Sequence, residues 1–222
     1  MSMLEKLSAR LFALWYPLAM HYTEIYGQQE TRHRLVGQAY GRTLEIGAGS
    51  GYNLAHYTRA VSELIVSEPS PFMLRLLERK LTASAPPVGS WQLEQAGAER
   101  LPYPDDSFDT VVGTLVHCTI PDSAAAMREI NRVLRPGGQY LFLEHVRARP
   151  GTVRGRIQDL LVGPHRWICA GCYPNRDTES TLAASPLAVQ VLEHGTMPRA
   201  PFTLRPTIVG KANAGQANAV AA

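Results

Sequence analysis

Apolar residues recur along the chain with two different spacings, and the change from one to the other predicts its elements. Residues 3–40 carry them at the spacing of an amphipathic helix, and Pro17 and Gly27 divide this segment into about three expected helices. From residue 43 onward, short apolar runs alternate with turn residues and further helical stretches. Because this alternation is typical of buried parallel strands covered by helices, we predict an α/β domain behind a helical N-terminal segment.

The apolar runs define seven expected strands with helices between them. The last strand follows a proline-broken loop at 197–205, and we expect it to run antiparallel between the fifth and sixth strands. Residues 213–222 are rich in Ala, Asn, Gly and Gln, which favours a disordered tail. The expected strands are residues 43–46, 64–68, 91–94, 108–114, 139–144, 187–194 and 206–211, and the main expected helices are residues 52–56, 71–81 and 123–134.

Three glycines at alternate positions, Gly47, Gly49 and Gly51, stand between the first strand and the first helix. This is the layout of a nucleotide-binding turn, where the backbone bends tightly and a ligand comes close. Glu45 precedes the turn, and a carboxylate there would repel a pyrophosphate but suits a cationic amine. Glu68 ends the second strand about 20 residues further on, where a carboxylate accepts both hydrogen bonds of a ribose diol. Together they predict S-adenosylmethionine rather than NAD as the ligand.

With these blocks in place, the chain resembles the class I S-adenosylmethionine-dependent methyltransferases over about residues 20–212. The matching blocks are residues 44–51, 65–70, 99–109 and 133–138. The resemblance implies a Rossmann-like, seven-stranded, mostly parallel sheet with an antiparallel last strand, and helices on both faces. It also implies a helical lid at 1–40, a methyltransferase domain at 41–212 with an acceptor-specificity insertion at 145–181, and a tail at 213–222.

The resemblance further implies S-adenosyl-L-methionine as cofactor, with S-adenosyl-L-homocysteine as product. Met73 matches the position that packs on the adenine in the family. Gly97 stands where many members have an aspartate that bonds the adenine amine, so the backbone at Ala98 or the side chain of Glu99 must take that role here. The implied cofactor-binding residues are Glu45, Gly47, Ala48, Gly49, Asn53, Glu68, Pro69, Met73, Ala98, Glu99 and Thr114.

A narrower resemblance, to thiol S-methyltransferases, depends on residues 114–118 and 143–146 and on Gly171-Cys172 followed by Arg176. It implies S-methylation of a hydrophobic thiol. Three other functions stay open: O- or C-methylation of a quinone or phenol, N-methylation of an amine such as a phospholipid head group, and non-catalytic binding of S-adenosylmethionine. The aromatic residues of the N-terminal segment suit an apolar acceptor of any of these kinds.

Two histidines that directly follow or lie near strand ends, His117 and His145, are the candidate bases. A thiol is partly ionised at neutral pH and needs a weak base or none, whereas a phenol or alcohol needs a positioned one. The Asn-Pro-Pro-Tyr sequence of methyltransferases that act on amino groups of DNA bases or glutamine is absent after the fourth strand. The expected acceptor-binding residues are Tyr16, Tyr22, Tyr26, His117, His145, Trp167, Cys172 and Arg176.

The composition limits the classes of ligand and partner that are expected. The net charge of +3 is too small for a nucleic-acid footprint, and we expect a small-molecule acceptor. The longest apolar run, 11–20, is about half of a membrane span. The three cysteines, Cys118, Cys169 and Cys172, favour a reducing cytoplasm, and the Cys169/Cys172 pair lacks further ligands at zinc spacing, so no metal is expected. A monomer or homodimer is expected.

Overall fold

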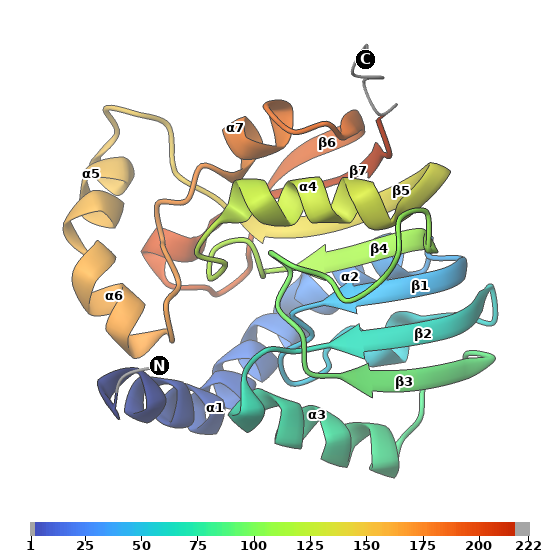
Figure 1. Cartoon of the computed structure of the whole chain (residues 1–222). Helices are drawn as coiled ribbons and strands as arrows, with labels where there is room; N and C mark the ends of the chain where they lie inside the picture. The colour runs from blue at the N-terminus through green and yellow to red at the C-terminus, as the bar shows by residue number, and fades with distance from the viewer. Residues whose placement is uncertain (1–2, 216–222) are drawn as a thin grey trace.

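A seven-stranded sheet in the order β3-β2-β1-β4-β5-β7-β6 forms the centre of the chain, as a computed structural model of residues 3–215 describes it (Figure 1). Strands β3, β2, β1, β4 and β5 run parallel to one another, whereas β7 runs antiparallel to both β5 and β6. The predicted Rossmann-like sheet and the position of its last strand are therefore confirmed. The strands are β1 (Gly41–Ile46), β2 (Val61–Ser67), β3 (Ser90–Glu94), β4 (Phe108–Thr114), β5 (Leu134–His145), β6 (Ala188–Thr196) and β7 (Pro206–Asn213).

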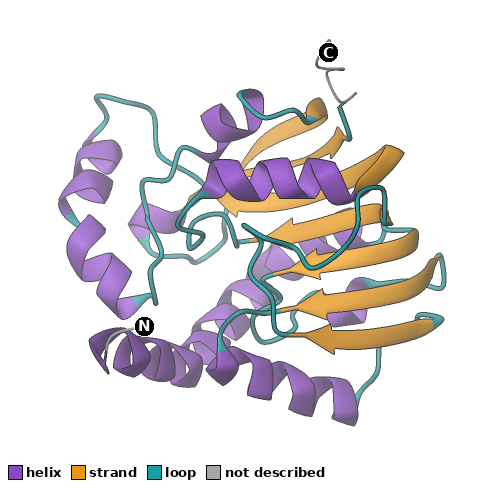
Figure 2. Cartoon of the chain, viewed as in Figure 1, coloured by secondary structure: helices purple, strands orange, loops and turns teal. Residues whose placement is uncertain are grey.

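Helices cover both faces of the sheet (Figure 2). Alternate residues of each buried strand point to opposite faces, so Val111 packs with one helical layer and Val112 with the other. The helices α2 (Gln29–Val36) and α3 (Pro71–Ala83) cover the face of Val112, and α4 (Ser123–Val133) and α7 (Thr178–Ala183) cover the face of Val111. The insertion between β5 and β6 adds α5 (Val153–Leu160) and α6 (Val162–Ile168).

Capping residues read from the sequence explain where α3 and α4 begin. The Ser70 side chain accepts a hydrogen bond from the Met73 N–H, and Pro71 occupies the first turn, where no N–H is needed. The Asp122 carboxylate accepts from the Ala125 N–H at 2.8 Å and starts α4. Both helices lie where the pattern predicts them, because the capping residue and the apolar face of each helix indicate the same starting position.

The N-terminal segment differs from its prediction at Pro17. Helix α1 (Met3–Thr23) continues through Pro17, because a proline in a helix removes only one backbone hydrogen bond and α1 is held from outside. The Pro17 carbonyl accepts a hydrogen bond from the Tyr52 hydroxyl. The predicted break at Gly27 is confirmed: its φ of +121° lies within a π-helical turn, η1 (Glu24–Gln28), which joins α1 to α2.

Three smaller expectations also change. The segment after the glycine turn forms only a short 3₁₀ turn, η2 (Leu54–His56), rather than a helix over 52–56. Helix α4 ends at Val133, because Leu134 already pairs with Phe108 as the start of β5. Residues 213–215 are ordered: Asn213 pairs with Gln139 at the end of β7. Residues 1–2 of the expected lid and 216–222 of the expected tail lie outside the described residues.

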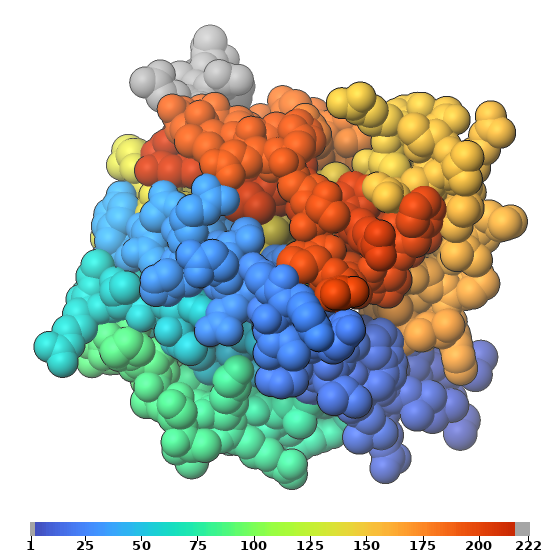
Figure 3. Space-filling view, turned by 180° about the vertical axis from the view of Figure 1, so that it is seen from behind, coloured from blue at the N-terminus to red at the C-terminus, as the bar shows by residue number. Residues whose placement is uncertain are grey.

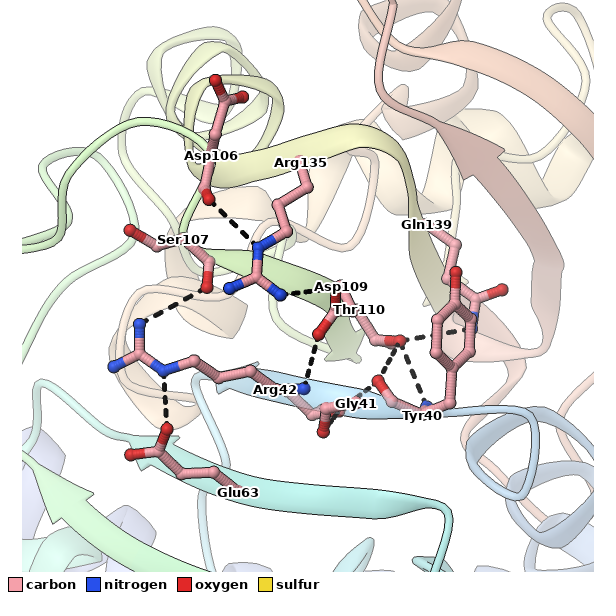
Figure 4. Close-up of polar contacts among 11 residues, drawn as sticks. Tyr40, Gly41, Arg42, Glu63, Asp106, Ser107, Asp109, Thr110, Arg135 and Gln139 are labelled. Atoms are coloured by element: carbon pink, nitrogen blue, oxygen red, sulfur yellow. Dashed lines mark hydrogen bonds and ion pairs between the residues drawn. The ribbon is translucent and has the colours of Figure 1, made fainter.

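The end of the sheet opposite the glycine turn is held by charged side chains (Figure 4). The Asp109 carboxylate accepts from the Arg42 backbone N–H at 2.8 Å and from the Arg135 guanidinium at 2.7 Å. Arg42 reaches Glu63 on β2 at 2.6 Å. This network joins β1, β2 and β4 at their amino ends, so the carboxyl ends are left for ligands.

The loop before β7 packs against the N-terminal segment, so two regions far apart in the sequence are in contact. Gly27 lies against Pro198, and the Arg199 guanidinium lies over the Tyr26 ring at 4.9 Å. In the space-filling view from behind, the N-terminal segment and the segment before β7 lie side by side (Figure 3). A 3₁₀ turn, η3 (Phe202–Leu204), completes this segment. Within residues 3–215, no helix has the length and hydrophobicity that crossing a bilayer requires.

Candidate active site

A cavity of about 1440 Å³ lies beyond the carboxyl ends of β1, β2, β4 and β5. In Figure 1 the arrowheads of β1 to β4 point toward the side of the molecule where α1 and α6 lie, and both helices contribute residues to the cavity lining. The Ser8 hydroxyl on α1 donates to the Trp167 carbonyl on α6, so the two helices are joined. Most of the lining is apolar or aromatic, and it includes Phe12, Trp15, Tyr16, Met20, Tyr22, Met73, Leu115, Val116, Ile120, Trp167, Ile168, Ala200 and Leu204.

The glycine turn forms the floor of this cavity, which Gly47 and Gly49 both line. Gly47 has a φ of +59°, and a Cβ there would lie 2.2 Å from Cγ2 of Val116. Only glycine fits, because both the backbone conformation and the neighbouring side chain exclude a larger residue. Val116 reaches this position because Leu115 takes a left-handed conformation, with φ +56°, directly after β4.

Glu68 projects into the same part of the cavity from the end of β2. Its two oxygens accept from the Gly49 and Ser70 N–H groups, each at 2.8 Å. A carboxylate has further lone pairs, so both oxygens retain capacity for the hydroxyls of a ribose. Burial raises the pKa of Glu68 above its ordinary value, and the two N–H groups oppose that shift.

Four further residues predicted to bind the cofactor line the same cavity as Glu68. They are Pro69, Met73, Ala98 and Glu99. Met73 Cε and the Tyr16 ring lie within 4 Å of where a Cβ on Gly49 would stand, so the space over the turn is bordered but open. A glycine floor, a carboxylate placed as for a ribose and the neighbouring apolar side chain of Met73 fit S-adenosylmethionine.

Three expected cofactor residues, Glu45, Asn53 and Thr114, lie behind the glycine turn and do not line the cavity. The Asn53 amide donates to the Glu45 carboxylate and to the Thr114 hydroxyl, both at 2.9 Å. The Tyr57 hydroxyl donates to the other Glu45 oxygen at 2.7 Å. Burial raises the pKa of Glu45 to about 7. Ala48 also lies off the cavity, where its N–H donates to the Ser67 carbonyl.

Arg32 on α2, which is not among the predicted site residues, completes this buried network. Its guanidinium donates to the Glu24 carboxylate at 2.7 Å, to Asn53 at 2.8 Å and to Thr114 at 2.7 Å. Arg32 and Glu24 are eight positions apart across the Gly27 kink. No local pattern predicts that such a pair is buried, because two of the partners of Arg32, Asn53 after β1 and Thr114 on β4, come from distant sequence.

His117, expected as a catalytic base, is fully buried behind the cavity wall. Its Nδ1 lies 2.8 Å from the Ser123 hydroxyl and its Nε2 lies 2.8 Å from the Tyr140 hydroxyl. Burial lowers the pKa of His117 to about 3. Because both nitrogens are engaged and neither reaches the cavity, the expectation of contact with an acceptor is corrected: His117 joins β4, α4 and β5.

His145, the second expected base, does line the cavity, together with Cys118 and Cys172. Its Nε2 lies 3.2 Å from the Cys172 sulfur. The contact with Cys172 and burial raise the pKa of the Cys118 thiol well above its ordinary value. This part of the cavity is therefore lined by two buried cysteine sulfurs and one buried imidazole.

The remaining expected acceptor residues divide into two groups. Tyr16, Tyr22 and Trp167 line the cavity. Tyr26 does not: it packs on the Tyr22 ring with centroids 4.8 Å apart. Arg176 also lies outside the lining, and its guanidinium donates to the Ile120 carbonyl at 2.7 Å. Arg176 thus ties the loop after α6 to the loop after β4.

Glu144, next to His145, is not among the predicted site residues, yet it holds in place the loop that packs against the glycine turn at the floor of the cavity. One of its carboxylate oxygens accepts from the Val116 and His117 N–H groups at 3.0 and 3.2 Å. Burial raises the pKa of Glu144 to about 7. Its other oxygen is buried without a hydrogen-bond partner in the part of the chain that the structure describes.

Comparisons with known proteins agree with this geometry. The methyltransferase domain family matches residues 44–142. Human thiol S-methyltransferase TMT1A is 30% identical over 169 residues, which cover 76% of this chain and 69% of the human protein. The chain therefore belongs to the class I S-adenosylmethionine-dependent methyltransferases, and its cofactor is S-adenosylmethionine.

Two further comparisons show how broad the family is. The ubiquinone/menaquinone biosynthesis C-methyltransferase UbiE of Vibrio vulnificus is 38% identical over 106 residues, covering 46% of this chain and 40% of that protein. The crystal structure of a SAM-dependent methyltransferase from Thermotoga maritima superposes with a TM-score of 0.64 at 17% identity, covering 92% of this chain and 98% of that one. The latter likeness concerns the fold alone.

Proposed function

We propose that this methyltransferase acts on the sulfur of a small hydrophobic thiol. The observation that carries the proposal is the end of the cavity, where an apolar wall closes on Cys118, Cys172 and His145. A buried, sulfur-lined end suits a hydrophobic thiol, because burying a permanently charged acceptor there would cost several kcal/mol. The name of the human relative, a thiol S-methyltransferase, supports the same acceptor class.

The cofactor end would be formed by the glycine turn and the strand ends beside it. Glu68 would accept the ribose hydroxyls, Gly47 and Gly49 would allow close approach of the methionine part, and Met73 with Ala98 would pack on the adenine. Glu45 would act from behind the turn through Asn53 rather than by direct contact. S-adenosylmethionine supplies an activated methyl group, so the protein need only orient the acceptor and exclude water.

The acceptor end would be formed by the N-terminal segment and the insertion. We propose that residues 1–40 act as a lid and that residues 145–181 set acceptor specificity, within a methyltransferase domain spanning 41–212. Tyr16 and Tyr22 from α1 and Trp167 from α6 all line the cavity. His145 is the expected base that reaches this end, and it can receive the proton of the acceptor.

A ring carbon or oxygen of a quinone or phenol is the second candidate acceptor. The similarity to the UbiE protein favours it, and the aromatic lining can hold a planar ring. That similarity covers less than half of this chain, whereas the similarity to the human thiol enzyme covers 76% of it. The longer match favours the thiol.

The test is incubation of the purified protein with methyl-labelled S-adenosylmethionine and a matched panel of alkyl thiols, aryl thiols, phenols, quinols and amines. Mass spectrometry then identifies the methylated atom. We expect thioethers, with rates that rise with the hydrophobicity of the thiol. The Glu68→Ala variant should bind S-adenosylhomocysteine more weakly in calorimetry and lose rate in proportion, because a buried polar contact is removed.

Methylated quinols, phenols or amines without any thioether would refute the thiol assignment while leaving the methyltransferase class intact. Tight binding of S-adenosylhomocysteine with no methylated product from any class of the panel would instead support a non-catalytic binding module. A polar thiol such as glutathione, methylated as fast as hydrophobic thiols, would contradict the proposed role of the apolar lining.

A further inference from the structure

Three side chains with metal-binding atoms meet at the acceptor end of the cavity. Cys118 follows β4, His145 ends β5, and Cys172 follows α6, so they come from three distant segments. Their ligand atoms all lie within 4.8 Å of one another, and His145 Nε2 is 3.2 Å from the Cys172 sulfur. All three are buried, at 3%, 3% and 7% exposure, and all three line the cavity.

The backbone holds these segments together independently of the three side chains. The Tyr173 N–H donates to the Cys118 carbonyl at 2.8 Å, next to Cys172. The Arg176 guanidinium adds a second tie, to Ile120. Phe12 from α1 packs against the buried cysteines, so the cluster has an apolar neighbour. The cluster is therefore prepared by the fold rather than by chance contact of mobile side chains.

A second observation concerns the other ring nitrogen of His145. Nδ1 of His145 is buried and has no hydrogen-bond partner among residues 3–215. Buried polar atoms are nearly always paired, and an unpaired one indicates an unseen water or ion. A histidine that binds a metal through Nε2 commonly donates its Nδ1–H to water or a carbonyl, and that second partner fixes the ring.

We propose that Cys118, His145 and Cys172 form a zinc site with one open position that faces the acceptor. Two thiolates and one imidazole are a donor set that zinc prefers, and three protein ligands are typical of catalytic rather than structural zinc. Ligand atoms around one tetrahedral zinc ion lie roughly 3.6–3.8 Å apart. Small side-chain rotations bring the three atoms to that separation.

The open position would bind the acceptor sulfur, and this role rests on the proposed function, in which the acceptor is a thiol. A thiol that binds zinc there loses its proton to solvent and becomes a thiolate, as the two cysteines do when the ion binds. The acceptor sulfur then donates an electron pair to the methyl carbon, while the bond from that carbon to the cofactor sulfur breaks and its pair stays on that sulfur. The neutral thioether is a weaker ligand and leaves. In this arrangement His145 is a ligand, not a base.

Cys169 provides a matched control within the same loop. It forms the C-x-x-C with Cys172 and is likewise buried, but its sulfur lies 4.0 Å from His165 Nδ1 and it is not a member of the cluster. Burial raises the pKa of Cys169 to about 12. A zinc site built on the sequence motif would need Cys169, whereas the site proposed here does not.

The test uses the reduced full chain, freed of metal with a chelator and kept in a phosphine reductant. Titration with Co²⁺ should give one ion per chain, with sulfur-to-cobalt charge-transfer absorption and the visible bands of tetrahedral cobalt, and Zn²⁺ should displace it. Cys118→Ser, Cys172→Ser and His145→Ala should each weaken metal binding by more than about 100-fold, exceeding the 10–100-fold typical of an outer-shell loss. Cys169→Ser should bind as the parent does. Calorimetry with S-adenosylhomocysteine shows that each variant is folded.

A hydrophobic thiol added with S-adenosylhomocysteine should shift the visible cobalt bands, and the matching alcohol should not. Absence of cobalt or zinc binding by the reduced parent, or equal loss in Cys169→Ser, would overturn the site. A Cys118–Cys172 disulfide in the untreated protein, with no metal binding after reduction, would overturn it as well. Metal binding without a thiol-dependent shift would overturn the open position. Methylation of phenols alone by the zinc-loaded protein would refute the thiol acceptor but not the metal site.

Discussion

Single residues at the glycine turn show how closely the cavity floor is built. The Val116 side chain occupies the space where a Cβ of residue 47 would stand. The left-handed conformation of Leu115 and the hydrogen bond from the Val116 N–H to the Glu144 carboxylate hold Val116 there. A non-glycine residue with positive φ costs of order 1–3 kcal/mol and is often found next to a functional site. The floor is therefore stabilised from β5, although it belongs to β1 and β4.

Gly47→Ala should lose stability and cofactor affinity together. The backbone conformation alone costs of order 1–3 kcal/mol, and the displaced Val116 disturbs the floor in addition. Urea unfolding and calorimetry with S-adenosylhomocysteine measure the two effects. Gly151→Ala is the control, because Gly151 also has a positive φ, +80°, but no atom within 4 Å of its Cβ position. Equal behaviour of the two variants would contradict the role assigned to the Val116 contact.

His117 should make the protein less stable in mild acid. Its pKa is about 3 when folded and about 6.5 when unfolded, so its contribution is present above pH 6.5 and is lost as the pH falls. The slope of this loss should rise from about 0.7 kcal/mol per pH unit at pH 6.5 to about 1.3 kcal/mol per pH unit at pH 4.5. Glu45 and Glu144 change the stability with pH in the opposite direction. Their pKa values are raised to about 7 in the folded protein, so the stability that their protonated forms contribute is lost as the pH rises through about 7.

The measurement is therefore a difference between the parent and His117→Gln, in urea unfolding across this pH range. Glu45 and Glu144 are present in both proteins, so their effects cancel. The parent should lose its advantage over the variant as the pH falls. Parallel profiles would mean that His117 titrates normally and that its two hydroxyl contacts do not hold it neutral.

At the scale of elements, strands were predictable and long-range clusters were not. The runs at β1, β2 and β4 are apolar because helices cover both faces, and this pattern needs only local sequence. The continuation of α1 through Pro17 depends on contacts with Tyr52 and α6, which no local pattern contains. The metal-type cluster was missed because its members are 27 residues apart, beyond the spacing of any local ligand motif.

Arg32 should be the residue through which α2 and η1 stabilise the core of the site. Arg32→Leu leaves Glu24 buried without its cation, and breaking a buried pair in this way costs about 3–5 kcal/mol. The double variant Glu24→Leu with Arg32→Leu should recover much of that loss, since neither charge remains. Urea unfolding of the three proteins measures the coupling.

Arg34→Leu is the matched control on the same helix. Its guanidinium pairs with Glu193 on β6, but both side chains are largely exposed. Exposed pairs contribute little, because water and salt screen them. A stability loss as large as that of Arg32→Leu would show that any arginine of α2 matters equally, and would contradict a specific role for the buried network.

At the scale of the whole molecule, the cavity is assembled from both ends and the middle of the chain. Helix α1 from the N-terminal segment and α6 from the insertion meet over the strand ends, joined through Ser8 and Trp167. The loop before β7 adds Ala200 and Leu204 to the lining. Closing the cavity around ligands therefore requires that these three segments stay together. Two of the three tryptophans, Trp15 and Trp167, lie within these segments.

Filling the cavity should change the emission of Trp15 and Trp167, which line it, and not that of Trp91 on β3. Both lining rings are now partly exposed, so an apolar thioether bound with S-adenosylhomocysteine should remove water from them and shift their emission to the blue. Trp91→Phe should keep this response, and the double variant Trp15→Phe with Trp167→Phe should lose it while still binding in calorimetry. A response that persists in the double variant would place the ligand outside the space between α1 and α6.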